Sequence, residues 1–113
     1  MTLIWHNPRC SKSRQTLALL EERGEEVTIR AYLDDAPGAD EIRAALQALG
    51  LRAIDITRRG EAIFKKLGLS KSDDDATLIA AMAAHPKLIE RPIVFKNGKA
   101  ALGRPPEAVL EIL

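Results

Sequence analysis

At 113 residues, the chain has the length of one domain and is too short for two. Hydrophobic residues make up 46% of it and aromatic residues only 4%, so we expect a core of leucine, isoleucine, valine and alanine. The 17 basic and 16 acidic residues give a net charge of +1, which excludes a strong general attraction to nucleic acid or to an anionic membrane. Binding of a small anion by a few local cations is compatible with this charge.

The sequence also argues against membrane-spanning helices and internal disulfides. No apolar run approaches the roughly 20 residues that a membrane-spanning helix needs. The first residues lack the charged and apolar regions of a signal peptide, so we expect a cytoplasmic protein. The single cysteine cannot form an internal disulfide, and no cluster of cysteine and histidine has the spacing of metal ligands, so we expect no metal site.

The first third of the chain predicts a β-α-β unit. Residues 2–5 form an apolar run of strand type, and the stripe of Thr16, Leu17 and Leu20 predicts a helix that ends before Gly24. Residues 27–32 alternate between apolar and polar side chains, which indicates a second strand. Strands connected through a helix are expected to be parallel, with a right-handed crossover.

The middle of the chain is predicted to be helical in short pieces. Apolar residues from 42 to 49 repeat with helical spacing, and Gly50 is placed to end that helix. A second helix around residues 63–67 is expected to stop near Gly68. A third is predicted to start at a capping box formed by Ser72 and Asp75, and to end at His85 because Pro86 follows.

The last part of the chain returns to strands. Residues 92–95 and 100–102 are predicted to form a hairpin, because Asn97-Gly98 between them is a typical type I′ turn. A final helix carries Val109, Leu110 and Leu113. This order of elements resembles the thioredoxin-like fold. We therefore expect a single α/β domain over residues 1–113, with a four-stranded mixed sheet and a helical insertion between strands 2 and 3.

Cys10 is the residue around which the chemistry is expected to be organised. It lies where the first strand gives way to a helix, so unpaired backbone N–H groups and the positive end of the helix dipole would favour its thiolate. The polar and cationic neighbours support a reactive thiol; these are His6, Arg9, Lys12 and Arg14. The alternative is that Cys10 is a small buried hydrophobe.

Three separated motifs together resemble the ArsC family of glutaredoxin-coupled arsenate reductases. They are H-N-P-x-C-x-x-S-R at residues 6–14, E-R-P-I-V at 90–94 and G-R-P-P-E at 103–107. The resemblance covers essentially the whole chain and implies reduction of arsenate to arsenite. In this mechanism a cysteine thiolate attacks arsenate, glutathione adds to the arsenic adduct, and glutaredoxin helps to complete the reduction. Glutathione is then a co-substrate, and no bound cofactor is implied.

The resemblance also implies roles for particular residues. Cys10 is the nucleophile, and the arginines that hold the oxyanion correspond to Arg58, Arg91 and Arg104. Arg59 is an alternative to Arg58, because the motif around these two residues is weak. Arginine suits such an anion because its planar guanidinium is always charged and presents paired donors. Any one of these arginines could instead be a solvated surface charge.

Residues close to the cysteine have alternative structural roles. The resemblance implies that His6 favours the thiolate, but a turn residue bonded to backbone is the alternative. Ser13 is expected either to bond the thiolate or to cap a first-turn amide, and Arg14 either to add charge or to lie on the helix surface. Arg91-Pro92 is expected to contain a cis peptide bond, as the thioredoxin-like fold implies.

Competing function classes fit the motifs less well. A low-molecular-weight tyrosine phosphatase would need an arginine at position 16, where Thr16 stands, and a dithiol oxidoreductase would need cysteine in place of Ser13. A non-enzymatic, Spx-like regulator that binds RNA polymerase shares the fold, although the anion-holding arginines are not typical of it. A glutathione-dependent thiol oxidoreductase that acts on another substrate also stays open.

Overall fold

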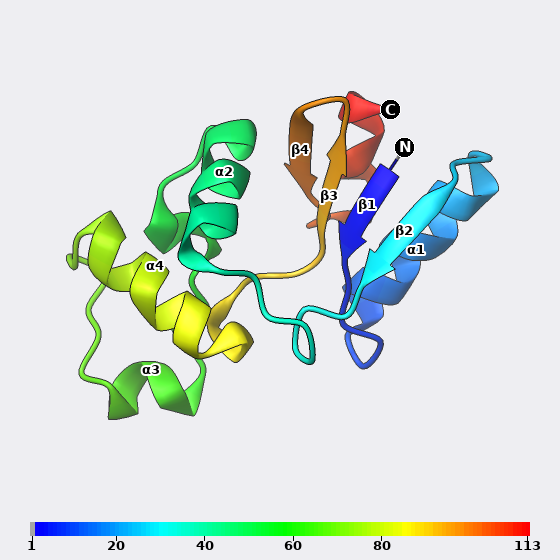
Figure 1. Ribbon diagram of the computed structural model, residues 1–113. Helices are drawn as coiled ribbons and strands as arrows, with labels where there is room; N and C mark the ends of the chain where they lie inside the picture. The colour runs from blue at the N-terminus through cyan, green and yellow to red at the C-terminus, as the bar shows by residue number, and fades with distance from the viewer. Residues whose placement is uncertain (1) are drawn as a thin grey trace. The chain divides into compact units, whose positions relative to one another are not determined.

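The chain forms a four-stranded mixed sheet (Figure 1). The computed structural model describes residues 2–113. The strands are ordered β2-β1-β3-β4, with β1 parallel to β2 and the other neighbours antiparallel. The predicted mixed sheet and the helical insertion between its second and third strands are confirmed. The strands span Thr2–Trp5 (β1), Val27–Arg30 (β2), Ile93–Lys96 (β3) and Lys99–Leu102 (β4).

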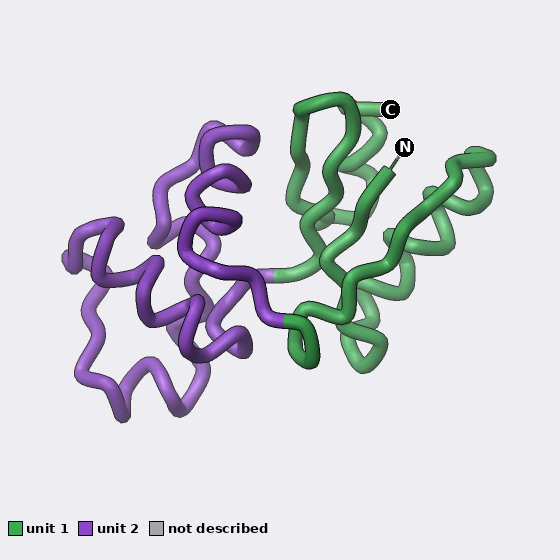
Figure 2. Tube along the Cα trace, in the orientation of Figure 1, with its two compact units in different colours: residues 1–35, 91–113 green, residues 36–90 purple. Residues whose placement is uncertain are grey.

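The helices fall into two compact units of the chain (Figure 2). The first unit, residues 1–35 and 91–113, contains the sheet, and the second comprises residues 36–90. Within residues 2–113, no helix is long and apolar enough to cross a bilayer. The prediction of a single domain over residues 1–113 stays a prediction. The first unit contains α1 (Ser11–Glu22) and the 3₁₀ helix η3 (Pro106–Ile112); the second contains α2 (Ala39–Leu49), η1 (Ala53–Ile56), α3 (Ala62–Lys66), α4 (Asp75–Ala84) and η2 (Pro86–Leu88).

The core of the first unit connects α1 and η3 to the sheet. Ile4 of β1, Leu20 of α1, Val94 of β3 and Val109 of η3 are fully buried in one cluster. Burial of each such side chain stabilises the fold by roughly 1.5–3 kcal/mol. Because Ile4 and Leu20 lie on either side of the 6–10 loop, their packing fixes the position of that loop and of Cys10.

The expected hairpin turn is confirmed. Asn97 has a φ of 52° and Gly98 a φ of 77°, and a type I′ turn requires a positive φ at both central residues. The predicted second strand ends earlier than expected, at Arg30, because the carbonyl of Ala31 accepts hydrogen bonds from the amides of Asp34 and Asp35 and starts a turn. The final helix is present as η3, a 3₁₀ helix.

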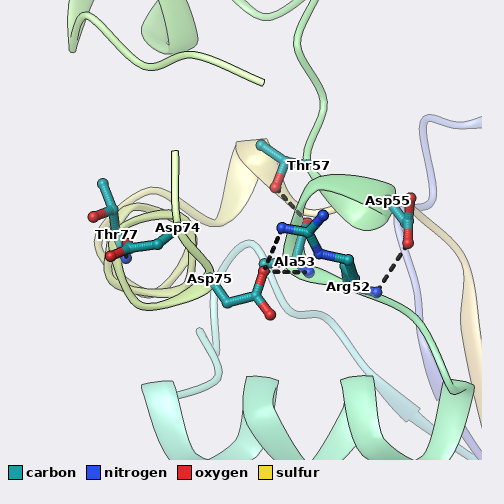
Figure 3. Close-up of polar contacts among 7 residues, drawn as sticks. All are labelled: Arg52, Ala53, Asp55, Thr57, Asp74, Asp75 and Thr77. Atoms are coloured by element: carbon teal, nitrogen blue, oxygen red, sulfur yellow. Dashed lines mark hydrogen bonds and ion pairs between the residues drawn. The ribbon is translucent and has the colours of Figure 1, made fainter. Parts of the chain in front are cut away.

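The second unit confirms two helix ends and corrects one helix start. Gly50 closes α2 in the left-handed conformation, and α4 ends before His85, as predicted. The predicted capping box at Ser72 is wrong. Asp74 is the N-cap of α4 and accepts a 2.8 Å hydrogen bond from the amide of Thr77 (Figure 3). Ser72 instead pairs with Ser70 through their hydroxyls, in a separate turn before the helix.

Candidate active site

Cys10 occupies the N-cap of α1, as expected from the sequence. Its φ of −93° and ψ of 123° are extended, and its carbonyl accepts the first hydrogen bond of the helix from the amide of Arg14, at 3.0 Å. The amide of Cys10 donates to the carbonyl of Asn7, also at 3.0 Å, which closes the loop before the helix. Cys10 is 9% exposed. It therefore lies at the positive end of the α1 dipole, where an anion is favoured.

Arg104 brings a guanidinium to this cysteine from the other end of the chain. Its Nη1 lies 3.9 Å from the Cys10 Sγ and donates a 3.0 Å hydrogen bond to the carbonyl of Arg91. Arg104 is otherwise exposed, whereas Arg91 is half-buried. The structure thus places Cys10 and Arg104 together, with Arg91 contributing its backbone carbonyl to the arrangement.

Ser13 forms contacts different from the two expected. Its hydroxyl lies 2.7 Å from Nδ1 of His6 and accepts a 3.0 Å hydrogen bond from the amide of Asn7. Neither partner is the thiolate or a first-turn amide of α1. Both lie in the loop that precedes the helix, so Ser13 ties this loop to α1. Ser13 is fully buried and His6 is 7% exposed, so the contact is shielded from water.

The surroundings of His6 disfavour its charged form. Its burial, and secondarily the positive charge of Arg14, lower the pKa of His6 below its ordinary value. Arg14 itself donates a 3.0 Å hydrogen bond to the carbonyl of Pro8. His6 supports the loop through its contact with Ser13, and its expected influence on the Cys10 thiolate stays a prediction.

This lowered pKa predicts that acid destabilises the first unit. The unfolded chain takes up a proton at His6 near pH 6.5, whereas the folded protein does so only at lower pH. Stability is therefore fully present above pH 6.5 and falls as the pH drops through the folded pKa. We expect the urea midpoint, followed by the fluorescence of Trp5, to fall more between pH 7.5 and 5.5 in the unmodified protein than in His6→Gln. Equal falls would contradict this assignment.

Pro92 and Gly103 pack against each other in the first unit. The Arg91–Pro92 peptide bond is cis, as expected, and a second cis bond precedes Pro105. The amide of Gly103 donates a 2.9 Å hydrogen bond to the carbonyl of Pro92. Pro92 and Gly103 are both buried. The two motifs at residues 90–94 and 103–107 are thereby joined directly.

Arg58 and Arg59 lie in the second unit. Arg58 pairs with the carboxylate of Glu61 at 3.1 Å and with that of Glu90 at 3.6 Å. Arg59 is exposed. Both line a cavity of about 710 Å³ that also includes Lys71 and Glu90. The role of Arg58, or of Arg59 in its place, in binding an anion stays a prediction.

The comparison with known proteins decides the family. The model of the ArsC family matches residues 5–112. The chain belongs to the ArsC family. It is 47% identical to an arsenate reductase of Neisseria meningitidis, over 97% of this chain and 96% of the relative. It is 50% identical to the uncharacterized protein YfgD of Escherichia coli, over 97% and 94%. A solved arsenate reductase structure from Vibrio cholerae is similar at a TM-score of 0.95 and 51% identity, covering 99% of this chain and 97% of that one.

One residue of this ArsC-family site was missed by the sequence analysis. The side-chain oxygen of Asn7 accepts a 3.0 Å hydrogen bond from the amide of Arg9, and its carbonyl accepts one from Cys10. Asn7 therefore shapes the turn that presents the cysteine. The Asn-Pro dipeptide is a known turn signal and could have identified this role.

Proposed function

We propose that the chain reduces arsenate to arsenite, with Cys10 as the nucleophile and with glutathione and glutaredoxin as the sources of electrons. The observation that carries the proposal is the guanidinium of Arg104, 3.9 Å from the sulfur of the only cysteine. The name arsenate reductase on relatives 44% to 47% identical over 97% or more of the chain supports the same reaction.

Arsenate chemistry explains why cations are needed beside a thiolate. Attack by a thiolate on a dianion brings like charges together, so fixed positive groups must offset the repulsion in the transition state. The N-terminus of α1 supplies one such positive end at Cys10. Arg104 supplies a full charge. We propose that Arg91 and either Arg58 or Arg59 complete the set of donors to the oxyanion.

The proposed reaction balances with two thiols as reductants. The Cys10 thiolate attacks arsenic and an oxygen leaves as water; a glutathione thiol then replaces a second oxygen, which also leaves as water. A glutaredoxin thiol attacks the glutathione sulfur, and the electron pair of the broken arsenic–sulfur bond reduces arsenic(V) to arsenic(III). One water then releases arsenite from Cys10. The net products are arsenite, one mixed disulfide and one water.

The residues around Cys10 are proposed to position it. Ser13 and Asn7 hold the 6–10 loop against α1, and His6 orients Ser13 through the 2.7 Å contact. Arg14 fastens the loop from the outside through the carbonyl of Pro8. These contacts fix the direction of the thiolate, so little conformational entropy is lost when it reaches the transition state.

A coupled assay tests the proposal. Purified protein is mixed with arsenate, glutathione, glutathione reductase and glutaredoxin, and NADPH oxidation is followed. We expect oxidation that needs both arsenate and the protein, and that falls when glutaredoxin is omitted. Oxidation that is independent of arsenate would overturn arsenate as the substrate. Full activity without glutaredoxin would overturn only the proposed electron source.

A further inference from the structure

Gly103 occupies a space that no side chain fits. A Cβ built on it would lie 2.6 Å from Cγ of Pro92 and 2.6 Å from Oγ1 of Thr16, with Cγ2 of Thr16 at 3.2 Å. Ordinary van der Waals contact of a Cβ begins at 3.4 Å. Gly103 is not among the glycines with positive φ in the described chain. Close packing, rather than an unusual backbone conformation, therefore requires glycine here.

The two neighbours of Gly103 belong to the segments that form the candidate site. Thr16 is buried on α1, the helix that begins after Cys10, and its hydroxyl is bonded to the carbonyl of Lys12 within that helix. Pro92 directly follows Arg91, and its carbonyl accepts the amide of Gly103 at 2.9 Å. Gly103 thus lies in contact with both segments at once.

Arg104 follows Gly103 and reaches back to the same two segments. Its Nη1 contacts the Cys10 Sγ at 3.9 Å and the Arg91 carbonyl at 3.0 Å. Because the backbone of residue 103 is pressed against Thr16 and Pro92, the start of the Arg104 side chain is fixed relative to Cys10.

We propose that Gly103 is a positioning residue: its missing side chain lets the 103–105 loop approach α1 and Pro92 closely enough for Arg104 to reach Cys10. Its importance for arsenate rests on the function proposed above, but the positioning itself concerns only the sulfur and the guanidinium. A methyl group at residue 103 must move the loop until contacts of 2.6 Å become 3.4 Å or more. The Arg104 contact would be lost with that movement.

The charge beside the sulfur can be measured without arsenate. The chain has one cysteine, so alkylation reports on Cys10 alone. Anionic iodoacetate and neutral iodoacetamide attack the same thiolate, so the ratio of their rates cancels the fraction of thiol that is ionised. A cation about 4 Å from the carboxylate of iodoacetate favours the anionic reagent by roughly fivefold in a water-like environment. We expect this ratio to fall about fivefold in Arg104→Ala.

Gly103→Ala is expected to lower the ratio of the iodoacetate rate to the iodoacetamide rate by nearly as much as Arg104→Ala. Combining the two substitutions in Gly103→Ala/Arg104→Ala should lower this ratio no further. Thr16→Ala/Gly103→Ala, in which only the Pro92 contact stays too short, is expected to give an intermediate ratio. High salt should shrink all these differences, because it screens exposed charges. A folded Gly103→Ala protein with an unchanged ratio would overturn the proposal, whatever its stability.

Two comparisons keep the test sharp. Gly38→Ala also adds a methyl group, but no atom lies within 4 Å of the new Cβ and its φ of −78° suits alanine, so its ratio should match the unmodified protein. If Gly103→Ala does not fold, the ratio of Thr16→Ala/Gly103→Ala is compared with that of Thr16→Ala alone, and equal ratios in these two proteins would overturn the proposal. If Gly103→Ala lowers the ratio but the unmodified protein does not reduce arsenate, only the proposed function is contradicted.

Discussion

Cys10→Ser is expected to abolish arsenate-dependent NADPH oxidation, with a loss of at least about a thousandfold. A serine hydroxyl stays protonated near neutral pH and cannot form the bond to arsenic that the two thiols later resolve. No other residue can take over, because the chain contains no second cysteine. The measurement is the coupled assay at saturating glutathione and glutaredoxin.

The same substitution should leave the fold intact, which makes its effect interpretable. Cys10 forms no side-chain hydrogen bond as the N-cap of α1, and serine is a preferred N-cap residue. We therefore expect the urea midpoint, read from the fluorescence of the single tryptophan, to be equal or slightly higher. Ser11→Ala, at the exposed neighbouring position, is the control and should keep its activity. Retention of most of the turnover in Cys10→Ser would end the assignment of Cys10 as nucleophile.

Arg104→Ala is expected to raise the KM for arsenate by about 10- to 100-fold, the range of one hydrogen bond to a charged group. The guanidinium is 3.9 Å from the sulfur, where the oxyanion must approach, so its loss removes a positive charge next to the proposed reaction. Arg104→Lys keeps the charge but loses the paired donors, so its KM should be intermediate. Initial rates over a range of arsenate concentrations measure the effect.

A surface arginine provides the matched control. Arg52 lies in the second unit and pairs at 3.8 Å with Asp75, beside η1 (Figure 3). Arg52→Ala should change the KM by less than about twofold, since exposed ion pairs contribute little.

Arg91→Ala should raise the KM for arsenate about as much as Arg104→Ala. The same assay on Arg58→Ala and Arg59→Ala identifies which of these two binds the anion. Equal, small effects in all variants would return the arginines to ordinary surface charges.

Local signals predicted the presentation of Cys10 well. A strand that ends before a helical stripe places a residue at the helix start, and the structure has Cys10 at that N-cap. Gly50 and the Asn97-Gly98 turn were likewise correct, because positive φ is a property of a single residue and its neighbours. These features depend on backbone conformation over a few residues, which the sequence expresses directly.

Contacts between segments that lie far apart in the sequence were harder to predict. The approach of Arg104 to Cys10 spans 94 residues, and only the resemblance to a family pointed to it. The partners of Ser13 depend on how the 6–10 loop folds back on α1, so neither expected contact was correct. Gly103 belongs to the motif at residues 103–107, but the motif does not reveal the reason for glycine, because its tight fit depends on contacts with Thr16 and Pro92 that only the folded chain brings together.

The sheet-containing unit is assembled from segments on both sides of residues 36–90, and this has a consequence for biosynthesis. A nascent chain that has emerged only as far as the second unit already carries the cysteine, but neither the strand β3 that pairs with β1 nor the guanidinium that reaches the sulfur. The ribosome therefore releases the thiol long before its electrostatic partner. The contact between Cys10 and Arg104 can form only after translation has passed Arg104.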